Sequence, residues 1–271
     1  FVFGLFTGLI AYFEPDNVDS FLSARNARTI ITQTVIVGIG ALGMTMVITS
    51  GGIDLSAGSQ IALTSVACAL TVNALSSGDP LVVGTLGVPL AVLVAMGTGA
   101  VTGFFNGSVS CYLKLPPFIV TLGTMMIARG AAEALAKQSQ VRTGDNVLKT
   151  LMARNPEPEW LVFAPGVWIM LALLVVVAVT MRYTLLGRYI YALGSNEQTA
   201  RLCGIPVTKY RIIIYTLSGV LVGISGVMSY AFIESGDPTT AVAKELDMIA
   251  AVVIGGGSLA GGRGSPVGTI V

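Results

Sequence analysis

Few residues in this chain are of types that could do chemistry. There is no histidine, so the commonest general base and the commonest metal ligand are both missing. The cysteines Cys68, Cys111 and Cys203 lie far apart and form neither a metal-binding pattern nor a disulfide framework. No nucleophile–base pair and no pair of catalytic carboxylates emerges. We therefore expect the chain not to be an enzyme and to bind no metal and no cofactor.

The most notable acidic residue is Asp54, which lies in GGIDLSAGS (51–59) between two long apolar runs. A carboxylate at membrane depth is a functional hypothesis by default, because burying it is costly. Asp54 and Ser56 also stand beside glycines at the expected start of a helix, where such side chains cap the first turn. We favour the helix cap and keep a role in a transport pathway as the alternative.

Other polar side chains interrupt apolar runs further along the chain. Asn106, Thr121 and Thr124 could face a transport pathway or could bond neighbouring helices, and the sequence leaves both open. Arg129 could line a pathway, but it also lies near enough to the expected outer surface for its head group to reach water.

Three glycine patterns have structural explanations. GIGALG (38–43) has the spacing of a dinucleotide-binding motif but lies inside an apolar run, where helix packing is the better interpretation. GSLAGGRG (257–264) lacks the lysine and hydroxyl of a phosphate-binding loop, so we expect a broken helix or re-entrant turn. Gly99, Gly103 and Gly107 recur every four residues and predict a face for close helix packing.

The composition indicates an integral membrane protein. The chain is 54% hydrophobic and 11% charged, with a mean hydropathy of +0.81, whereas soluble domains are about 25% charged. Its net charge of +1 offers no basic field for nucleic acid. We expect an all-α, polytopic helical bundle forming a single domain over 1–271, clipped at both ends. The predicted apolar segments are 1–13 (partial), 29–50, 59–76, 81–107, 117–136, 160–181, 212–233 and 248–271 (partial and broken).

The segment 182–211 sets the predicted orientation. It carries one acidic residue, Glu197, against a group of basic residues, and short basic loops between spans stay on the cytoplasmic side. The basic residues are Arg182, Arg188, Arg201, Lys209 and Arg211. Alternation then places 137–159 and 234–247 outside, and neither has a basic excess.

The middle of that segment predicts a short helix. Ser195 or Asn196 can cap it, and Gly204 followed by Pro206 ends it. Such a helix suits docking to another protein. An ordinary solvated linker, held inside by its charges, is the alternative.

Four blocks resemble one family in order and approximate spacing. They are GGIDLSAGS (51–59), LPPFIVTLGTMMIARG (115–130), GRYIYALGSNEQTARLCGI (187–205) and ELDMIAAVVIGGGSLAGGRGSPVGT (245–269). The family is the membrane permease of ribose-type bacterial ABC sugar importers, and the likeness covers nearly the whole chain.

The resemblance implies a fold, a location and partners. The fold would be that of the vitamin B12-type (type II) importers, in the bacterial inner membrane. Two permease copies, identical or related, would sit on cytoplasmic ABC ATPases that bind the ATP, and a periplasmic binding protein would deliver the sugar. The family's cytoplasmic coupling helix maps onto Gly194, Ser195, Asn196, Glu197, Ala200, Arg201, Gly204 and Ile205.

The function expected from this resemblance is a translocation path for a ribose-like pentose or another monosaccharide. Related permeases for nucleosides or branched-chain amino acids keep the architecture and change the cargo. A stand-alone secondary transporter is the rival from another class. It would require inverted repeats and coupling carboxylates, and the sequence shows no clear internal repeat.

Overall fold

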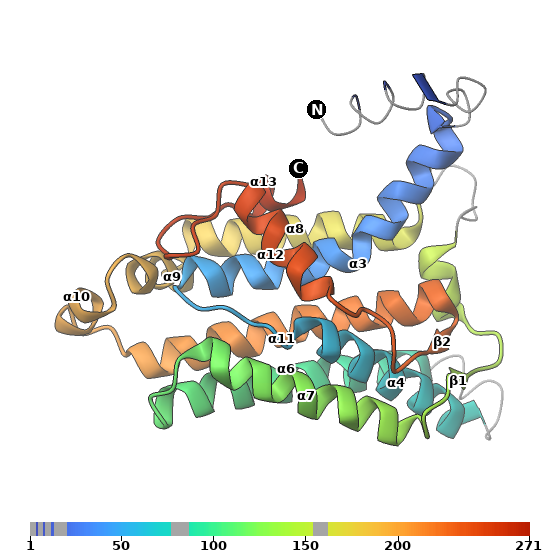
Figure 1. The fold of residues 1–271 in the computed structure, drawn as a ribbon, viewed down its shortest axis with the longest axis horizontal. Helices are drawn as coiled ribbons and strands as arrows, with labels where there is room; N and C mark the ends of the chain where they lie inside the picture. The colour runs from blue at the N-terminus through green and yellow to red at the C-terminus, as the bar shows by residue number, and fades with distance from the viewer. Residues whose placement is uncertain (1–3, 5–7, 9–11, 14–20, 77–86, 154–161) are drawn as a thin grey trace.

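Six long helices dominate the computed structural model, which describes residues 21–76, 87–153 and 162–271 together with residues 4, 8, 12 and 13. All six are long and apolar enough to cross a membrane. They run side by side along the long axis of the molecule (Figure 1). They are α3 (Ala24–Thr49), α4 (Ala57–Ser76), α6 (Val88–Tyr112), α7 (Pro117–Leu135), α8 (Pro165–Tyr183) and α11 (Val207–Ile233).

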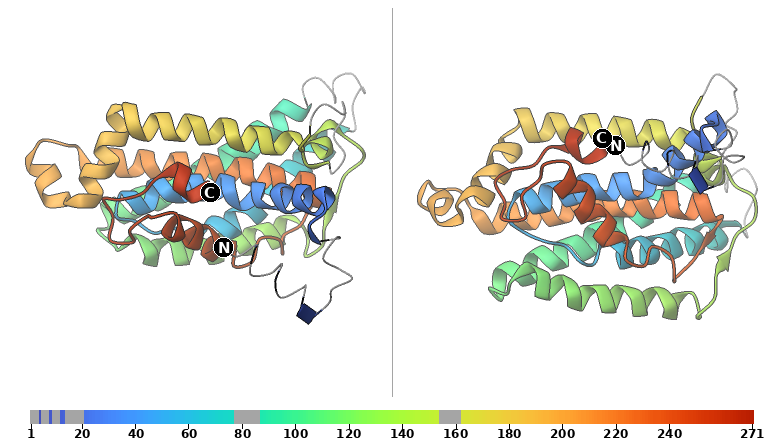
Figure 2. Two further views of the ribbon diagram at one scale, coloured as in Figure 1. Left: turned by 90° about the horizontal axis from the view of Figure 1, so that it is seen from above. Right: turned by 45° about the horizontal axis from the view of Figure 1, so that its top comes forward.

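Short elements close the two ends of this bundle (Figures 1 and 2). Helices α9 (Leu185–Ser195) and α10 (Glu197–Leu202) lie at one end, and a ribbon of two antiparallel two-residue strands lies at the other. The ribbon pairs β1 (Val141–Arg142) with β2 (Ser235–Gly236). Strand β1 is followed in the chain by the 3-10 helix η3 (Val147–Met152), and β2 is followed by α12 (Lys244–Ile254). The last element is α13 (Pro266–Ile270). The all-α helical bundle is confirmed.

Several helix boundaries differ from the sequence prediction, and two of the differences lie near α10. Helix α11 begins at Val207, so Lys209 and Arg211 lie in its first turns rather than in the loop. Helix α6 continues to Tyr112, five residues beyond the predicted end. The final apolar segment was predicted as broken, and its break lies in the glycine-rich turn 255–265, which separates α12 from α13.

Parts of three predicted segments lie outside the described residues. They are most of 1–13, residues 81–86 of the fourth segment and residues 160–161 of the sixth.

Helices α3, α4 and α11 form the centre of the bundle. In each of these three helices 67% of an apolar 18-residue stretch is buried, whereas in α6, α7 and α8 only 22–28% of the corresponding stretch is buried. The outer helices instead expose large apolar side chains such as Val101, Met126 and Val175. In water such a surface would be unfavourable, but in a bilayer it is the surface that lipid requires.

The closest helix pair is α6 with α11, and the glycines of the predicted packing face lie at this contact. A Cβ atom added at Gly99 would overlap the backbone of Gly219, and one at Gly103 would overlap the carbonyl oxygen of Tyr215. A Cβ atom at Gly107 would come within 2.8 Å of the Cα atom of Ile212. The two backbones approach this closely only because the side chains are absent.

Replacing Gly103 with leucine should therefore force α6 away from α11. Overpacking costs about 1–3 kcal/mol where neighbours can move, and here the obstruction is backbone. We expect a lower thermal unfolding temperature and a lower yield of monodisperse protein in detergent. Gly97→Leu is the matched control. Gly97 lies on the same helix, but a Cβ atom there meets nothing within 4 Å. Equal stability of the two variants would contradict this packing.

Candidate functional site

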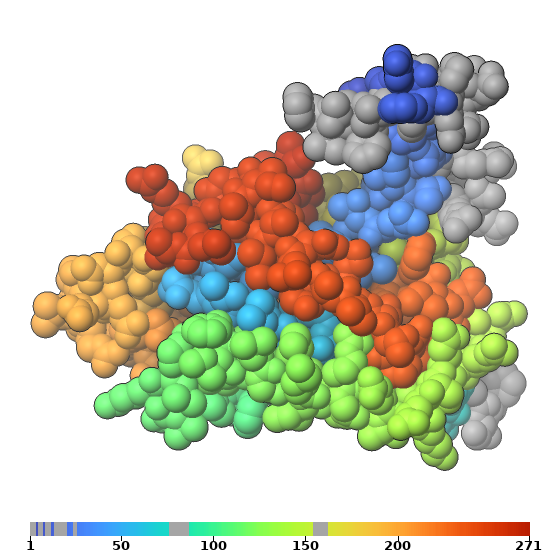
Figure 3. Space-filling view, viewed as in Figure 1, coloured from blue at the N-terminus to red at the C-terminus, as the bar shows by residue number. Residues whose placement is uncertain are grey.

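Helix α10 projects from one end of the bundle on a short, defined support (Figures 1 and 3). Asn196 has extended backbone angles, and its side-chain oxygen accepts a hydrogen bond from the Thr199 backbone N–H at 2.9 Å. Asn196 is therefore the cap, and Ser195 is the last residue of α9. Gly204, with a φ of 81°, follows the helix in the left-handed region.

The short helix has an inner face and an outer face. Ala200 is buried against the bundle, whereas Leu202 is 89% exposed. Glu197 accepts hydrogen bonds from Arg201 at 2.9 Å and from Arg211 of α11 at 2.7 Å. Burial alone would raise the pKa of Glu197, but the bonds and charges of Arg211 and Arg201 outweigh it and lower that pKa. At neutral pH the carboxylate thus ties α10 to α11.

A junction of backbone segments lies at the base of α10. The Gly262 N–H donates to the carbonyl oxygen of Thr49, the last residue of α3, at 2.9 Å. A Cβ atom at Gly194 would overlap that same Thr49 oxygen. The Tyr191 hydroxyl donates to the Gly264 carbonyl at 2.8 Å. The end of α3, the end of α9 and the turn 255–265 are thereby held together.

Beyond this junction the chain leaves the helical path between α3 and α4. Gly51 has a φ of 82°, and α4 begins at Ala57. Asp54 is fully buried, and its Oδ1 accepts hydrogen bonds from the Ser56 N–H at 2.9 Å and the Ser56 hydroxyl at 2.5 Å. This local turn immediately precedes α4, and Asp54 bonds the residue before the helix rather than a backbone N–H of its first turn.

The Ser56 hydroxyl connects three elements inside the bundle. Besides donating to Asp54, it accepts hydrogen bonds from Gln60 Nε2 at 2.6 Å and from Asn106 Nδ2 of α6 at 2.9 Å. Thr102 in turn donates to Gln60 Oε1 at 3.0 Å. Gln60 was not singled out from the sequence, although its place one helical turn after Ser56 was a usable signal. Asp54 Oδ2 and Asn106 Oδ1 are buried without a partner among the described residues.

Two further side chains satisfy the irregular backbone of this helix break. The Leu55 N–H donates to Thr121 Oγ1 of α7 at 3.1 Å, and the Tyr215 hydroxyl of α11 donates to the Ile53 carbonyl at 3.3 Å. Thr121 thus belongs to the break. Thr124 does not, because its hydroxyl donates to a carbonyl of its own helix.

Arg129 holds the opposite end of the bundle together. Its guanidinium donates to the carbonyl oxygens of Pro238 at 2.5 Å and Thr240 at 2.9 Å. Neither of these two bonds was predicted from the sequence. Arg129 fixes the connection between β2 and α12 onto α7.

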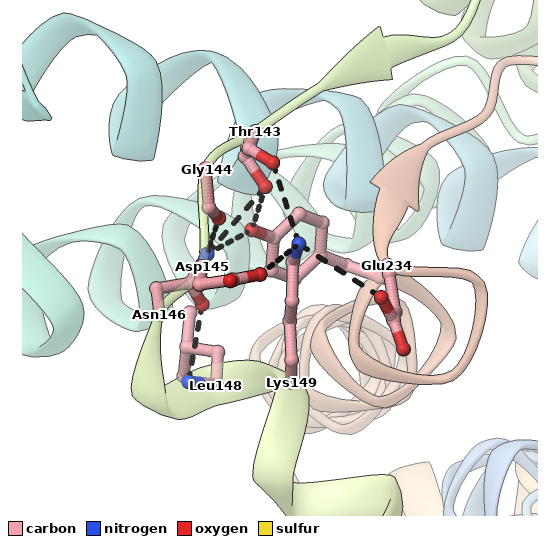
Figure 4. A network of polar contacts seen from close by, with 8 residues as sticks. Thr143, Gly144, Asp145, Asn146, Leu148, Lys149 and Glu234 are labelled. Carbon is pink, nitrogen blue, oxygen red and sulfur yellow. Dashed lines mark hydrogen bonds and ion pairs between the residues drawn. The ribbon is translucent and has the colours of Figure 1, made fainter.

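A polar network near Arg129 was not foreseen (Figure 4). The Lys149 ammonium lies 3.3 Å from the Thr143 carbonyl, 3.5 Å from Asp145 and 3.9 Å from Glu234. The Thr143 hydroxyl is 2.6 Å from that of Tyr230 on α11. A cavity of about 480 Å³ opens beside these residues. Contacts between segments 80 or more residues apart give no sequence signal.

No grouping of three or more potential metal-ligating side chains occurs in the residues that the structure describes. What the arrangement offers is mechanical. The structure combines the projecting helix α10, a backbone junction at its base and a buried non-helical break between the central helices α3 and α4.

The described residues form a bundle of six helices that are long and apolar enough to cross a membrane, which is the architecture of a multi-pass membrane protein. The family model described as the branched-chain amino acid transport system / permease component matches residues 26–271, and the chain belongs to that family. The resemblance derived from the four sequence blocks is confirmed.

Named relatives are similar over most of the chain. The ribose import permease protein of Escherichia coli (strain K12) is 39% identical over 93% of this chain and 75% of its own. The fructose import permease protein of Rhizobium meliloti is 36% identical, with 92% and 68% covered. A probable ABC transporter permease protein of E. coli (strain K12) is 34% identical, with 94% and 73% covered. No solved structure matches.

Replacing Ser56 with alanine should destabilise the helix break. Gln60, Asn106 and Asp54 would each lose a buried hydrogen bond, and one unsatisfied buried group costs about 1–3 kcal/mol. We expect a clear fall of the thermal unfolding temperature in detergent.

Ser108→Ala is the matched control for this experiment. The Ser108 hydroxyl is buried and has no partner in the described part of the chain, so its removal breaks no hydrogen bond there and should not lower the unfolding temperature. If both alanine variants have the same unfolding temperature as the wild type, the hydrogen bonds of Ser56 do not stabilise the break.

Proposed function

We propose that this chain is the permease subunit of an ABC importer and forms the membrane path for a monosaccharide such as ribose. The observation that carries the proposal is 39% identity, over 93% of the chain, to a protein named for ribose import. The fructose import permease of R. meliloti extends this to a second sugar. The family description mentions branched-chain amino acids, but these named relatives favour sugar as the cargo.

The same proposal assigns ATP to separate cytoplasmic ATPase subunits and gives this chain no cofactor. Helix α10 and its flanks dock on the ATPase, as the coupling helix does in the family that the sequence resembles. Exposure of Leu202 and Arg201 on a projecting helix supports this role. A second permease copy, identical or related, completes the path, and a periplasmic binding protein delivers the sugar.

Movement of α10 would reach the membrane interior through its base. The Gly262–Thr49 hydrogen bond joins the α9–α10 end to α3, and α3 leads within five residues to the break at Asp54. By this route a displacement of α10 reaches irregular backbone, in addition to the continuous helix α11 to which Glu197 and Arg211 tie it. Irregular backbone of this kind is where transporters place their moving parts.

The transport proposal is tested by reconstituting the permease with a candidate ABC ATPase and a candidate sugar-binding protein. We expect ATP-dependent uptake of labelled ribose, competed by unlabelled ribose and not by leucine. ATP-dependent uptake of leucine without ribose uptake would show that the cargo is wrong. Ribose uptake that needs no ATP would identify a secondary transporter.

The docking proposal predicts the effect of Leu202→Asp. A carboxylate on the tip of α10 should disrupt an apolar contact with the ATPase and reduce co-purification at least tenfold, because hot-spot side chains contribute about 2 kcal/mol or more. The unfolding temperature of the permease alone should stay unchanged, since the side chain is exposed. Val242→Asp at the opposite end is the control, with a parental side chain that is 68% exposed. Full co-purification with the Leu202 variant would exclude docking through this tip.

A further inference from the structure

A groove runs along the start of α11 beside α10. It has a volume of about 640 Å³ and lies between the end of α6 and the first turns of α11. Its lining includes Tyr112, Arg201, Lys209, Ile212 and Ile213. Cationic groups thus border a mainly apolar depression.

The charges around this groove do not balance. Glu197 is shared between Arg201 and Arg211, so one carboxylate faces two guanidinium groups. Lys209 has an exposed side chain and forms no ion pair with any residue in the described ranges. The groove therefore presents a free ammonium group and a net positive charge to its surroundings.

The apolar part of the groove follows the membrane-crossing direction. Ile212 and Ile213 lie three and four residues after Lys209 and therefore on the same face of α11, one turn further into the bundle. Tyr112, 73% exposed, stands at the end of α6, and tyrosine rings gather at the level of lipid head groups. The cation and the aromatic ring therefore lie at the outer end of the groove, and the aliphatic side chains lie one turn further inward.

We propose that this groove binds an anionic phospholipid of the cytoplasmic leaflet, with its phosphate at Lys209 and one acyl chain along Ile212 and Ile213. Charge complementarity selects an anionic head group over a neutral one, and basic side chains near the cytoplasmic surface attract such lipids. The aliphatic floor selects a lipid over free phosphate. The bound lipid would lie directly beside α10 and would stabilise its position against α11.

The test uses the purified full-length permease in detergent, without its partners. Its thermal unfolding temperature is measured during titration with dioleoylphosphatidylglycerol and, separately, with dioleoylphosphatidylcholine, which has the same acyl chains. We expect the anionic lipid to stabilise the protein at lower concentration, with an advantage that shrinks as salt rises. Lys209→Gln should need about fivefold more anionic lipid for the same effect.

Lys137→Gln provides the matched control, because it removes an exposed lysine at the opposite end of the bundle. This variant should respond to the anionic lipid as the wild type does. Equal responses to the two lipids, or equal responses of the Lys209 variant and the wild type, would overturn the proposal.

Two further arms separate the lipid from other occupants. Glycerol phosphate carries the charge without the chains, and stabilisation by it as strong as by the lipid would reassign the groove to soluble phosphates. Co-purification with the ATPase is measured for Lys209→Gln and should stay intact. If co-purification is lost while the lipid response is unchanged, the groove belongs to the ATPase interface and the lipid proposal is wrong.

Discussion

The whole structure depends on satisfying backbone polar groups where the chain stops being helical inside the bundle. Within a bilayer no water is at hand to replace a missing hydrogen bond. The break between α3 and α4 therefore needs partners from its neighbours, and it has them in Thr121 of α7 and Tyr215 of α11. Asp54 supplies the local turn, and Ser56 extends it to Asn106 of α6. Three neighbouring helices, α6, α7 and α11, are thus positioned by the requirements of one short irregular segment.

The second constraint is the close approach of backbone segments, which glycine residues allow at two places in the molecule. Along α6 and α11 glycine allows a central helix and an outer helix to touch over several turns, which places Tyr215 within reach of the break. At the base of α10, Gly194 and Gly262 allow three chain segments to meet at Thr49. A side chain at any of these positions would separate parts whose contact carries the proposed movement.

Local features of the structure could be predicted from the sequence because they depend on local chemistry. Apolar runs gave the spans, Asn196 and Gly204 delimited α10, and the glycines around Asp54 marked the break. Contacts between distant segments could not be predicted. The bond from Glu197 to Arg211 requires that α11 start at Val207, and the apolar run alone suggested a later start. Lys149 and Glu234 meet only because β1 pairs with β2.

The position of the junction explains how a rigid bundle can respond to a partner at its end. A continuous helix from α10 to the membrane centre would transmit any push along its whole length and would move the opposite end as well. Here Arg129 fixes that opposite end to the β2–α12 connection, whereas the turn 255–265 and the break after Thr49 both lack helical backbone. Under the proposed function, a push that travels through the junction would fall on the irregular backbone between Thr49 and Asp54, whereas the Glu197–Arg211 pair links α10 to the continuous helix α11. The inner half of the molecule, which holds this irregular backbone, is the half that a permease driven from the cytoplasm would have to open.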